Sequence, residues 1–217
     1  MGDLTALEVV VTAPVVSFRN PLYAGVQVNL PCPPPATVAG MLAAATGGWG
    51  RVDPALRFAM AFRAGGTGVD LETYHPLDGA GRATEATPRE REFLADVSLT
   101  VWLTSDLDSW QRRLRRPVWP LRLGRSQDLV AVRTRTVQLA ERPGHQLDAL
   151  LPGDASSVGT RLRLPTAVSV DRARTRWGDF RFVASGRSAE EIEESWSDPC
   201  GRAVILLPPS HPVHALN

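Results

Sequence analysis

The sequence predicts an α+β fold of the ferredoxin-like, RRM-type class, in which a four-stranded antiparallel sheet carries two helices on one face. Three observations support this class. The first 140 of the 217 residues give the order strand, helix, strand, long loop, strand, helix, strand. Both helical segments are bounded by residues that start or stop helices, and residues 93–103 carry the strongest strand pattern of the chain. The length allows one elaborate domain or two small ones.

The N-terminal segment predicts a strand that leads into a loop. Residues 4–11 alternate loosely between polar and apolar side chains and are rich in valine, which is typical of a strand. Pro14 ends the regular part of this strand because proline cannot donate to a sheet ladder. Residues 17–25, SFRNPLYAG, have the composition of a loop.

A run of prolines directly precedes the first predicted helix. Four prolines within residues 31–35 keep the backbone extended, since each fixes φ and disfavours helix in the residue before it. Pro34 or Pro35 can nevertheless open a helix, because the first helical position needs no N–H donor. The apolar face of this helix follows the spacing i, i+3, i+4, i+7, and two glycines end it: Val38, Met41, Leu42, Ala45, then Gly47 and Gly48.

The middle of the chain predicts two strands, a long loop and a helix. Residues 56–63 and 93–103 are the strands, and residues 65–91 between them have the composition of a loop that is long for a compact domain. Residues 105–116 predict a helix, with a capping box formed by Ser105 and Asp108 and with arginines in its last turns.

The rest of the chain predicts mainly strands. Residues 120–139 read as a short strand, a glycine turn and a longer strand. A short acidic helix is expected at residues 188–196, where Ser188 and Glu191 form a second capping-box pattern. We therefore expect a core at residues 1–140 and a β-rich extension at residues 141–217 packed on that core; the expected strands of the extension are 162–164, 167–171, 177–183 and 203–207.

Composition and charge exclude several classes of protein. No apolar run approaches the ~18 residues that a membrane span needs. The N-terminus has an acid where a signal peptide carries a base, so we expect a cytoplasmic protein. Cys32 and Cys200 lack metal-ligand spacing and are expected to be reduced structural thiols, and we expect no metal and no cofactor. A net charge of +1 argues against a simple DNA-coating protein.

Arginine supplies every basic side chain of this chain, which contains no lysine. A GC-rich genome alone can produce this bias. Arginine is also the residue that grips phosphate bidentately and stacks on bases. The absence of lysine removes one type of catalytic base.

Few residues are candidates for catalysis. The glycine-rich segments GGTG and GGWG lack the lysine and the spacing of a phosphate loop, so glycine turns explain them better. His75 stands beside Tyr74 in the expected long loop, and such a pair could cleave RNA without a metal, with histidine as general acid or base. The alternative is an exposed loop histidine with no catalytic role.

Arginines near glycines and hydroxyls are the main candidates for a binding site. In the segment LGRS, the backbone N–H groups of a glycine turn and one guanidinium could hold phosphate oxygens. Any single arginine could be an ordinary surface charge, but these gather at strand and loop ends of a fold that commonly binds single-stranded RNA. The candidates are Arg19, Arg89, Arg91, Gly124, Arg125, Ser126, Arg133 and Arg135.

Four segments in this order resemble the Cas-five family, the small RAMP-superfamily subunits of type I CRISPR effector complexes (Cascade). The helix entry and the LGRS segment are the most recognisable, and the SFRNP loop and PPPATV favour the type I-B branch. The resemblance covers roughly residues 4–140, through SFRNP, LPCPPPATVAGMLAAATG, TPREREFL and PLRLGRSQDLV.

The resemblance implies a RAMP-type core with a protruding β-hairpin, the thumb, which corresponds here to about residues 65–91. It also implies a non-catalytic subunit that binds the 5′ handle of the CRISPR RNA and caps a backbone of Cas-seven subunits in antiviral defence. The large, Cas-eight-type subunit would be a further partner, and target DNA would be met through the complex. Thr37 at the helix entry, His75 in the thumb and the turn at 124–126 would lie near the handle.

Two other functions remain open at this stage. One branch of the family, type I-C, cleaves the CRISPR RNA precursor with tyrosine, lysine and histidine. This chain has no lysine and no histidine next to LGRS, so only Tyr23 and His75 could be recruited for such a metal-independent endoribonuclease. The third possibility is an RRM-like protein-interaction module without an RNA role.

Overall fold

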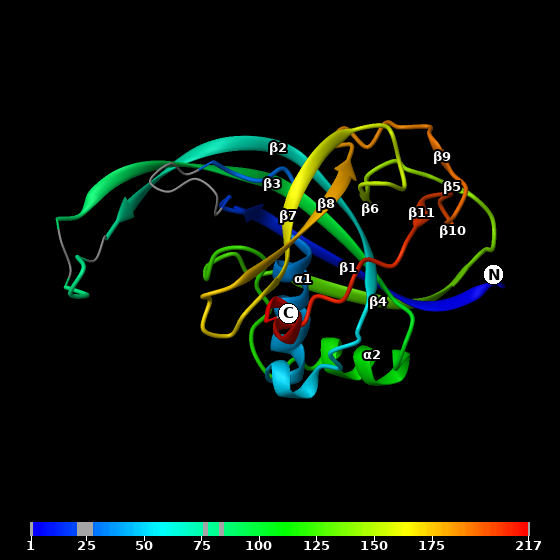
Figure 1. The fold of residues 1–217 in the computed structure, drawn as a ribbon, viewed down its shortest axis with the longest axis horizontal. Coiled ribbons are helices and arrows are strands. Elements are labelled where there is room, and N and C mark those ends of the chain that lie inside the picture. Colours follow the sequence, from blue (N-terminus) through cyan, green and yellow to red (C-terminus); the bar gives the residue numbers. More distant parts are fainter. Residues whose placement is uncertain (1, 21–27, 76–77, 83–84, 217) are drawn as a thin grey trace.

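The ferredoxin-like core predicted from the sequence is present in the computed structural model, which describes residues 2–20, 28–75, 78–82 and 85–216 (Figure 1). Its four strands lie in the order β4-β1-β3-β2, and every neighbouring pair is antiparallel. Each helix follows a strand and connects it to a strand two places away in the sheet. The elements are β1 (Leu4–Val16), α1 (Pro35–Thr46), β2 (Phe58–Tyr74), β3 (Thr87–Leu103), α2 (Leu107–Arg115) and β4 (Ala131–Leu139).

The C-terminal part of the chain extends this sheet on the β2 side to seven strands, in the order β4-β1-β3-β2-β6-β8-β7. The added strands are β6 (Ala149–Pro152), β7 (Thr160–Val168) and β8 (Thr175–Phe182). The short elements are η1 (Trp49–Arg51), β5 (Gly144–His145), β9 (Glu191–Ile192), β10 (Trp196–Ser197), β11 (Ala203–Val204) and η2 (Pro212–Ala215); β5 pairs with β9 and β10 with β11. The extension is thus β-rich, and the boundary near residue 140 stays a prediction.

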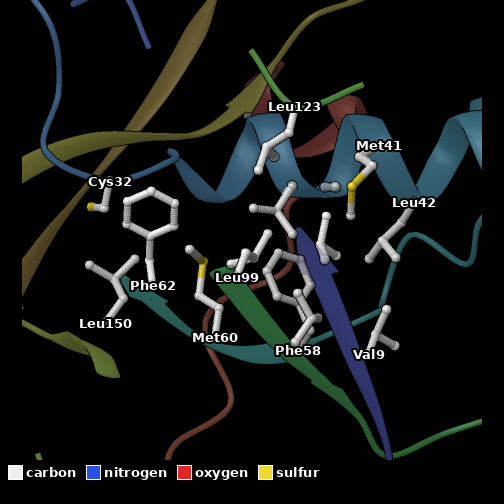
Figure 2. Packing of buried hydrophobic residues seen from close by; sticks show 14 of the residues in the cluster. Val9, Cys32, Met41, Leu42, Phe58, Met60, Phe62, Leu99, Leu123 and Leu150 are labelled. Carbon is white, nitrogen blue, oxygen red and sulfur yellow. The ribbon is translucent and has the colours of Figure 1, made fainter. Parts of the chain in front are cut away.

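Helix α1 lies at the centre of the main hydrophobic core (Figure 2). The apolar face predicted for it is confirmed, because Val38, Met41, Leu42 and Ala45 are all at most 2% exposed. The core also contains side chains from the sheet and from the C-terminal strands; these include Val9, Phe58, Met60, Phe62, Leu99, Leu123, Leu150, Leu164, Phe180 and Phe182. The helix is therefore buried by both the core strands and the extension.

The other face of the sheet carries a smaller cluster around Trp102, which is fully buried. Val204 of β11 joins it, and the guanidinium of Arg202 lies 5.5 Å from the ring centroid of Trp102. This cation–π contact and the apolar packing attach the short C-terminal strands to the core. No helix among the described residues is long and apolar enough to cross a membrane.

The composition of residues 65–91 predicted a loop, and for most of this segment that prediction is wrong. β2 and β3 continue as one antiparallel hairpin from the pair Phe58–Leu103 to the pair Tyr74–Thr87, and the hairpin projects from the rest of the molecule (Figure 1). One of the glycines that suggested a loop has a packing role: a Cβ on Gly68 would lie 2.4 Å from the Phe93 ring. The glycine leaves space for that cross-strand ring.

The predicted end of the first strand at Pro14 is also wrong, since β1 continues to Val16. The pairing of β1 with β4 stops at Thr12, while its pairing with β3 continues to Val16. Pro14 therefore lies in the part of β1 that pairs with β3 only and has no partner strand on its other edge. A missing N–H is tolerated at such an edge.

The helix predicted at residues 188–196 is not formed. The segment contains β9 and turns instead, and the carboxylate of Glu190 accepts hydrogen bonds from the hydroxyls of Ser156 and Ser157. Tertiary hydrogen bonding has replaced the local capping pattern. Helix α2 forms without its predicted capping box: its N-cap is Asp106, which has a left-handed φ of 51° and makes no side-chain cap bond.

The strands predicted after residue 120 are shifted or shortened. The short strand before the glycine turn is a single bridge between Arg122 and Leu129. The two pieces predicted at 162–164 and 167–171 form one strand, β7, with a bulge between Pro165 and Ala167, and the final strand is only the two residues of β11.

The central position of α1 gives a first prediction. Leu42→Ala is expected to lower the free energy of unfolding by about 2–5 kcal/mol, because the fully buried side chain leaves a cavity in the core. Urea unfolding followed by circular dichroism measures this. Leu129→Ala, at a side chain that is 56% exposed, is the control and should change stability by less than about 0.5 kcal/mol. Equal effects of the two variants would contradict the central role of α1.

Candidate nucleic-acid interface

A cluster of charged side chains joins the projecting hairpin to the LGRS turn. Arg125 of the turn contacts Glu72 of β2 at 2.5 Å and Asp128 at 3.0 Å. Arg91 of β3 contacts the same Glu72 at 3.5 Å, and its Nε donates to Ser17 Oγ at 2.9 Å. The Arg125 and Asp128 side chains are 10% and 2% exposed. We call Ser17, Glu72, Arg91, Arg125 and Asp128 the hairpin cluster.

The turn itself depends on glycine. Gly124 has a φ of 106°, and a Cβ there would lie 2.6 Å from the carbonyl oxygen of Ser17. The Asp128 carboxylate accepts hydrogen bonds from the backbone N–H groups of Ser17, at 3.1 Å, and of Arg125, at 2.9 Å. The N–H of Arg125 is thus already used within the protein, while Ser126 is exposed.

The electrostatics of the cluster favour a charged Arg125. Burial lowers its pKa, but the hydrogen bond to Glu72 and the charge of Asp128 outweigh this effect, so the pKa is raised overall. For Arg91, burial is the largest influence and lowers the pKa despite the nearby Glu72. Arg125 therefore acts as a cross-link between the turn and the hairpin, which is a positioning role.

A cleft opens at the start of α1, beside the hairpin cluster. Its lining includes Arg19 from the segment after β1, Thr37 from the first turn of the helix, Trp49 of η1 and Arg172 from the β7–β8 turn. Both arginines are exposed, and Thr37 is half-buried. Elements that are distant in sequence thus bring two cations to a helix start that has no side-chain cap.

A second cleft continues along α1 and shares Thr37, Trp49 and Arg172 with the first. Its lining also includes Gly124, Arg122 and Trp119, of which Arg122 is exposed and Trp119 is 58% exposed. We call the two together the α1 cleft. Exposed guanidinium groups beside aromatic rings are the side chains that hold phosphates and stack on the bases of single-stranded RNA.

The sequence interpretation named Arg19, Thr37 and Gly124 of this cleft but missed four lining residues: Trp49, Trp119, Arg122 and Arg172. Arg122 is only three residues from the predicted site residue Arg125, and Trp119 lies between two prolines in the same segment. Their proximity to the LGRS motif could have identified both as site residues. Arg172 belongs to the C-terminal part, and only the tertiary fold shows that it lies near Thr37.

The remaining predicted site residues lie elsewhere. Arg89 is exposed on the hairpin opposite Glu72, and His75 is exposed beside Tyr74 at the far end of β2. Arg133 and Arg135 are exposed on β4, which lies on the far side of β1 and β3 from β2. Arg135 pairs with the buried Glu8 at 2.5 Å. The structure does not bring these residues into the α1 cleft.

The residues considered for cleavage are not assembled in the part of the chain that the structure describes. Tyr23 lies outside the described residues, as does part of the predicted loop at 17–25. His75 and Tyr74 are both exposed at the end of the hairpin. Among the described residues, no group of three histidine, cysteine or acidic side chains is placed to hold a metal ion.

Comparison with known families identifies the chain. The family model described as CRISPR-associated protein (Cas_Cas5) matches residues 6–197. The chain belongs to this family. The match extends well into the C-terminal part, beyond the residues on which the sequence resemblance was based. Curated proteins give no match to the chain.

Two solved structures support the fold of this Cas-five family member. A chain of a "CRISPR RNA-guided surveillance complex" has a TM-score of 0.57 at 20% identity, with 97% of each chain covered. A CRISPR protein from Archaeoglobus fulgidus has a TM-score of 0.53 at 15% identity, covering 94% of this chain and all of the other. At these identities the likeness concerns the fold.

The hairpin cluster gives a second prediction. Glu72→Gln removes the carboxylate shared by Arg91 and Arg125, and a lost charge-assisted hydrogen bond costs about 1–3 kcal/mol. We expect amide hydrogen exchange in residues 87–93 to become about tenfold faster or more. Glu90→Gln, at an exposed position of the same hairpin, is the matched control. Unchanged exchange in Glu72→Gln would show that the cluster does not hold the hairpin.

Proposed function

We propose that this Cas-five protein is a non-catalytic subunit of a type I CRISPR effector complex and that its α1 cleft binds the 5′ handle of the CRISPR RNA. The observation that carries the proposal is the gathering of Arg19, Arg122 and Arg172 with two tryptophans in the two adjoining clefts along α1. A handle is single-stranded, so it needs cations for its phosphates and flat side chains for its bases. The similar fold in an RNA-guided surveillance complex supports the same assignment.

The hairpin cluster has a positioning role in this proposal. Arg125 and Arg91 are engaged by Glu72, Asp128 and Ser17, so they hold the hairpin next to the cleft rather than offering open guanidinium groups to RNA. The outer part of the hairpin carries Arg89 and His75, which are exposed and able to contact nucleotides there. The thumb would then approach the RNA from a fixed direction.

The remaining surface would contact other subunits. Val69 and Leu71 are 61% and 68% exposed on one face of the hairpin, where a Cas-seven subunit at the end of the backbone could bury them. The large, Cas-eight-type subunit would be a second protein partner, and target DNA would be met within the assembled complex. Such a subunit needs only a local basic patch, which agrees with its net charge of +1.

The cleft is tested by a double variant. Arg19→Gln with Arg172→Gln is expected to weaken binding of handle RNA by the reconstituted complex about tenfold or more, since each substitution removes a charged hydrogen-bond donor. Filter binding at fixed salt measures the effect. Arg112→Gln with Arg115→Gln on α2 changes the net charge equally and is the control. Equal losses in both variants would place the RNA elsewhere.

The absence of catalysis is tested with labelled repeat RNA in EDTA. The purified protein is expected to leave the RNA intact, because the exposed His75 is the only histidine on the hairpin segments that the structure describes and the chain has no lysine that could act with it. Gel analysis of the products over several hours measures this. Site-specific cleavage that His75→Ala abolishes would replace the proposal with the endoribonuclease.

A further inference from the structure

The β7–β8 hairpin carries a basic face that the α1 cleft does not include. Leu162, Leu164, Phe180 and Phe182 point into the main core. Because side chains alternate along a strand, the residues between them point outward. On β7 these are Arg161 and Arg163, and on β8 they are Asp179 and Arg181.

This part of the chain concentrates positive charge. Residues 160–182 contain six arginines and two aspartates, of which three arginines and one aspartate lie on this face, whereas the whole chain has a net charge of only +1. The rest of the molecule is therefore net acidic. The positive charge of this hairpin is higher than the average composition of the chain would give. An excess of one sign on a single hairpin indicates a partner of the opposite sign.

The pairing of the strands makes this concentration costly to the isolated protein. Arg161 and Arg181 are directly opposite each other in the β7–β8 register. Like charges at such positions oppose folding by some tenths of a kcal/mol, up to ~1 kcal/mol. Asp179 offsets part of this by bonding Arg161 at 3.2 Å, and Arg181 donates to the carbonyl of Gly159 at 3.1 Å. The placement of Arg161 opposite Arg181 does not stabilise the folded protein, so an anionic ligand that binds both is the better explanation for it.

We propose that the outer face of the β7–β8 hairpin, through the exposed Arg161 and Arg163 and the half-buried Arg181 beside them, binds the phosphate backbone of a nucleic-acid duplex. Outward side chains two residues apart on a strand are ~6.6 Å apart, and facing ones on paired strands are ~5 Å apart. Each strand of a duplex presents one phosphate per ~3.4 Å of helix axis, so several lie within reach of this arginine group.

The composition of the face favours a duplex over a single strand. Surfaces for single strands present successive aromatic rings on which bases stack. On this face Trp177 is the aromatic residue; it is half-buried and stands opposite the buried Pro165. Arginines without a stacking platform hold the backbone independently of sequence. None of the three arginines lines the α1 cleft, so this inference does not rest on the proposed handle binding.

The test compares charge variants of the full chain by fluorescence anisotropy, with mixed-sequence DNA duplex, RNA duplex and single-stranded DNA as probes across a salt series. Arg161→Gln with Arg163→Gln should weaken duplex binding about tenfold or more and reduce the slope of log affinity against log salt by about two. Asp179→Asn removes the acid on this face and should tighten binding. Arg112→Gln with Arg115→Gln, with the same charge change, should leave the affinity within about twofold.

Thermal unfolding of each variant shows that the fold is retained. If the double arginine variant loses affinity for the DNA duplex, the RNA duplex or both, but not for the single strand, the proposal is supported. The duplex that is affected identifies the source of the phosphates. The proposal is overturned if the wild-type chain binds none of the probes, if it prefers the single strand, or if the α2 control loses as much affinity as the hairpin variant. It is also overturned if Asp179→Asn weakens binding.

Discussion

The buried carboxylate of Asp128 is the interaction on which the arrangement of the site depends. A charge removed from water must be paired and hydrogen-bonded, and Asp128 receives the backbone N–H groups of Ser17 and Arg125 together with the Arg125 guanidinium. Arg125 then reaches Glu72 on the hairpin. One carboxylate thereby fixes the end of β1, the glycine turn and, through a single arginine, the direction of the thumb.

Helix α1 provides the second constraint, because the same residues serve the core and the cleft. Its apolar side chains are buried by the sheet and by the C-terminal strands, so the helix cannot shift without opening the core. The prolines before it fix the approach of the chain, and Thr37 follows directly at the cleft. The position of the proposed RNA site is thus set by hydrophobic packing, while its chemistry is supplied by exposed arginines along the helix.

Local patterns predicted the elements whose residues contact their own neighbours in sequence. The order of the core strands and helices followed from such patterns, as did the apolar face of α1. The composition of residues 65–91 did not predict the hairpin, which only the family resemblance implied, because Gly65, Gly66 and Gly68 have low strand propensity, although Gly68 is what allows Phe93 to pack across the strands. The expected helix near Ser188 failed because Glu190 bonds two distant serines. Arg172 was missed for the same reason: no local pattern places the β7–β8 turn beside α1.

A chain without lysine must use arginine both to support its structure and to bind its partners, and the structure separates the two uses. Arg91 and Arg125 are largely buried and contact carboxylates, where the planar fork of guanidinium joins several acceptors at once. Arg19, Arg122 and Arg172 are exposed around the cleft, where the same fork matches a phosphate. Proximity to a sequence motif therefore identifies an arginine with a role, but it does not show whether that role is to support the structure or to bind a ligand. Burial against carboxylates distinguishes Arg91 and Arg125, which position the thumb, from the exposed arginines of the α1 cleft.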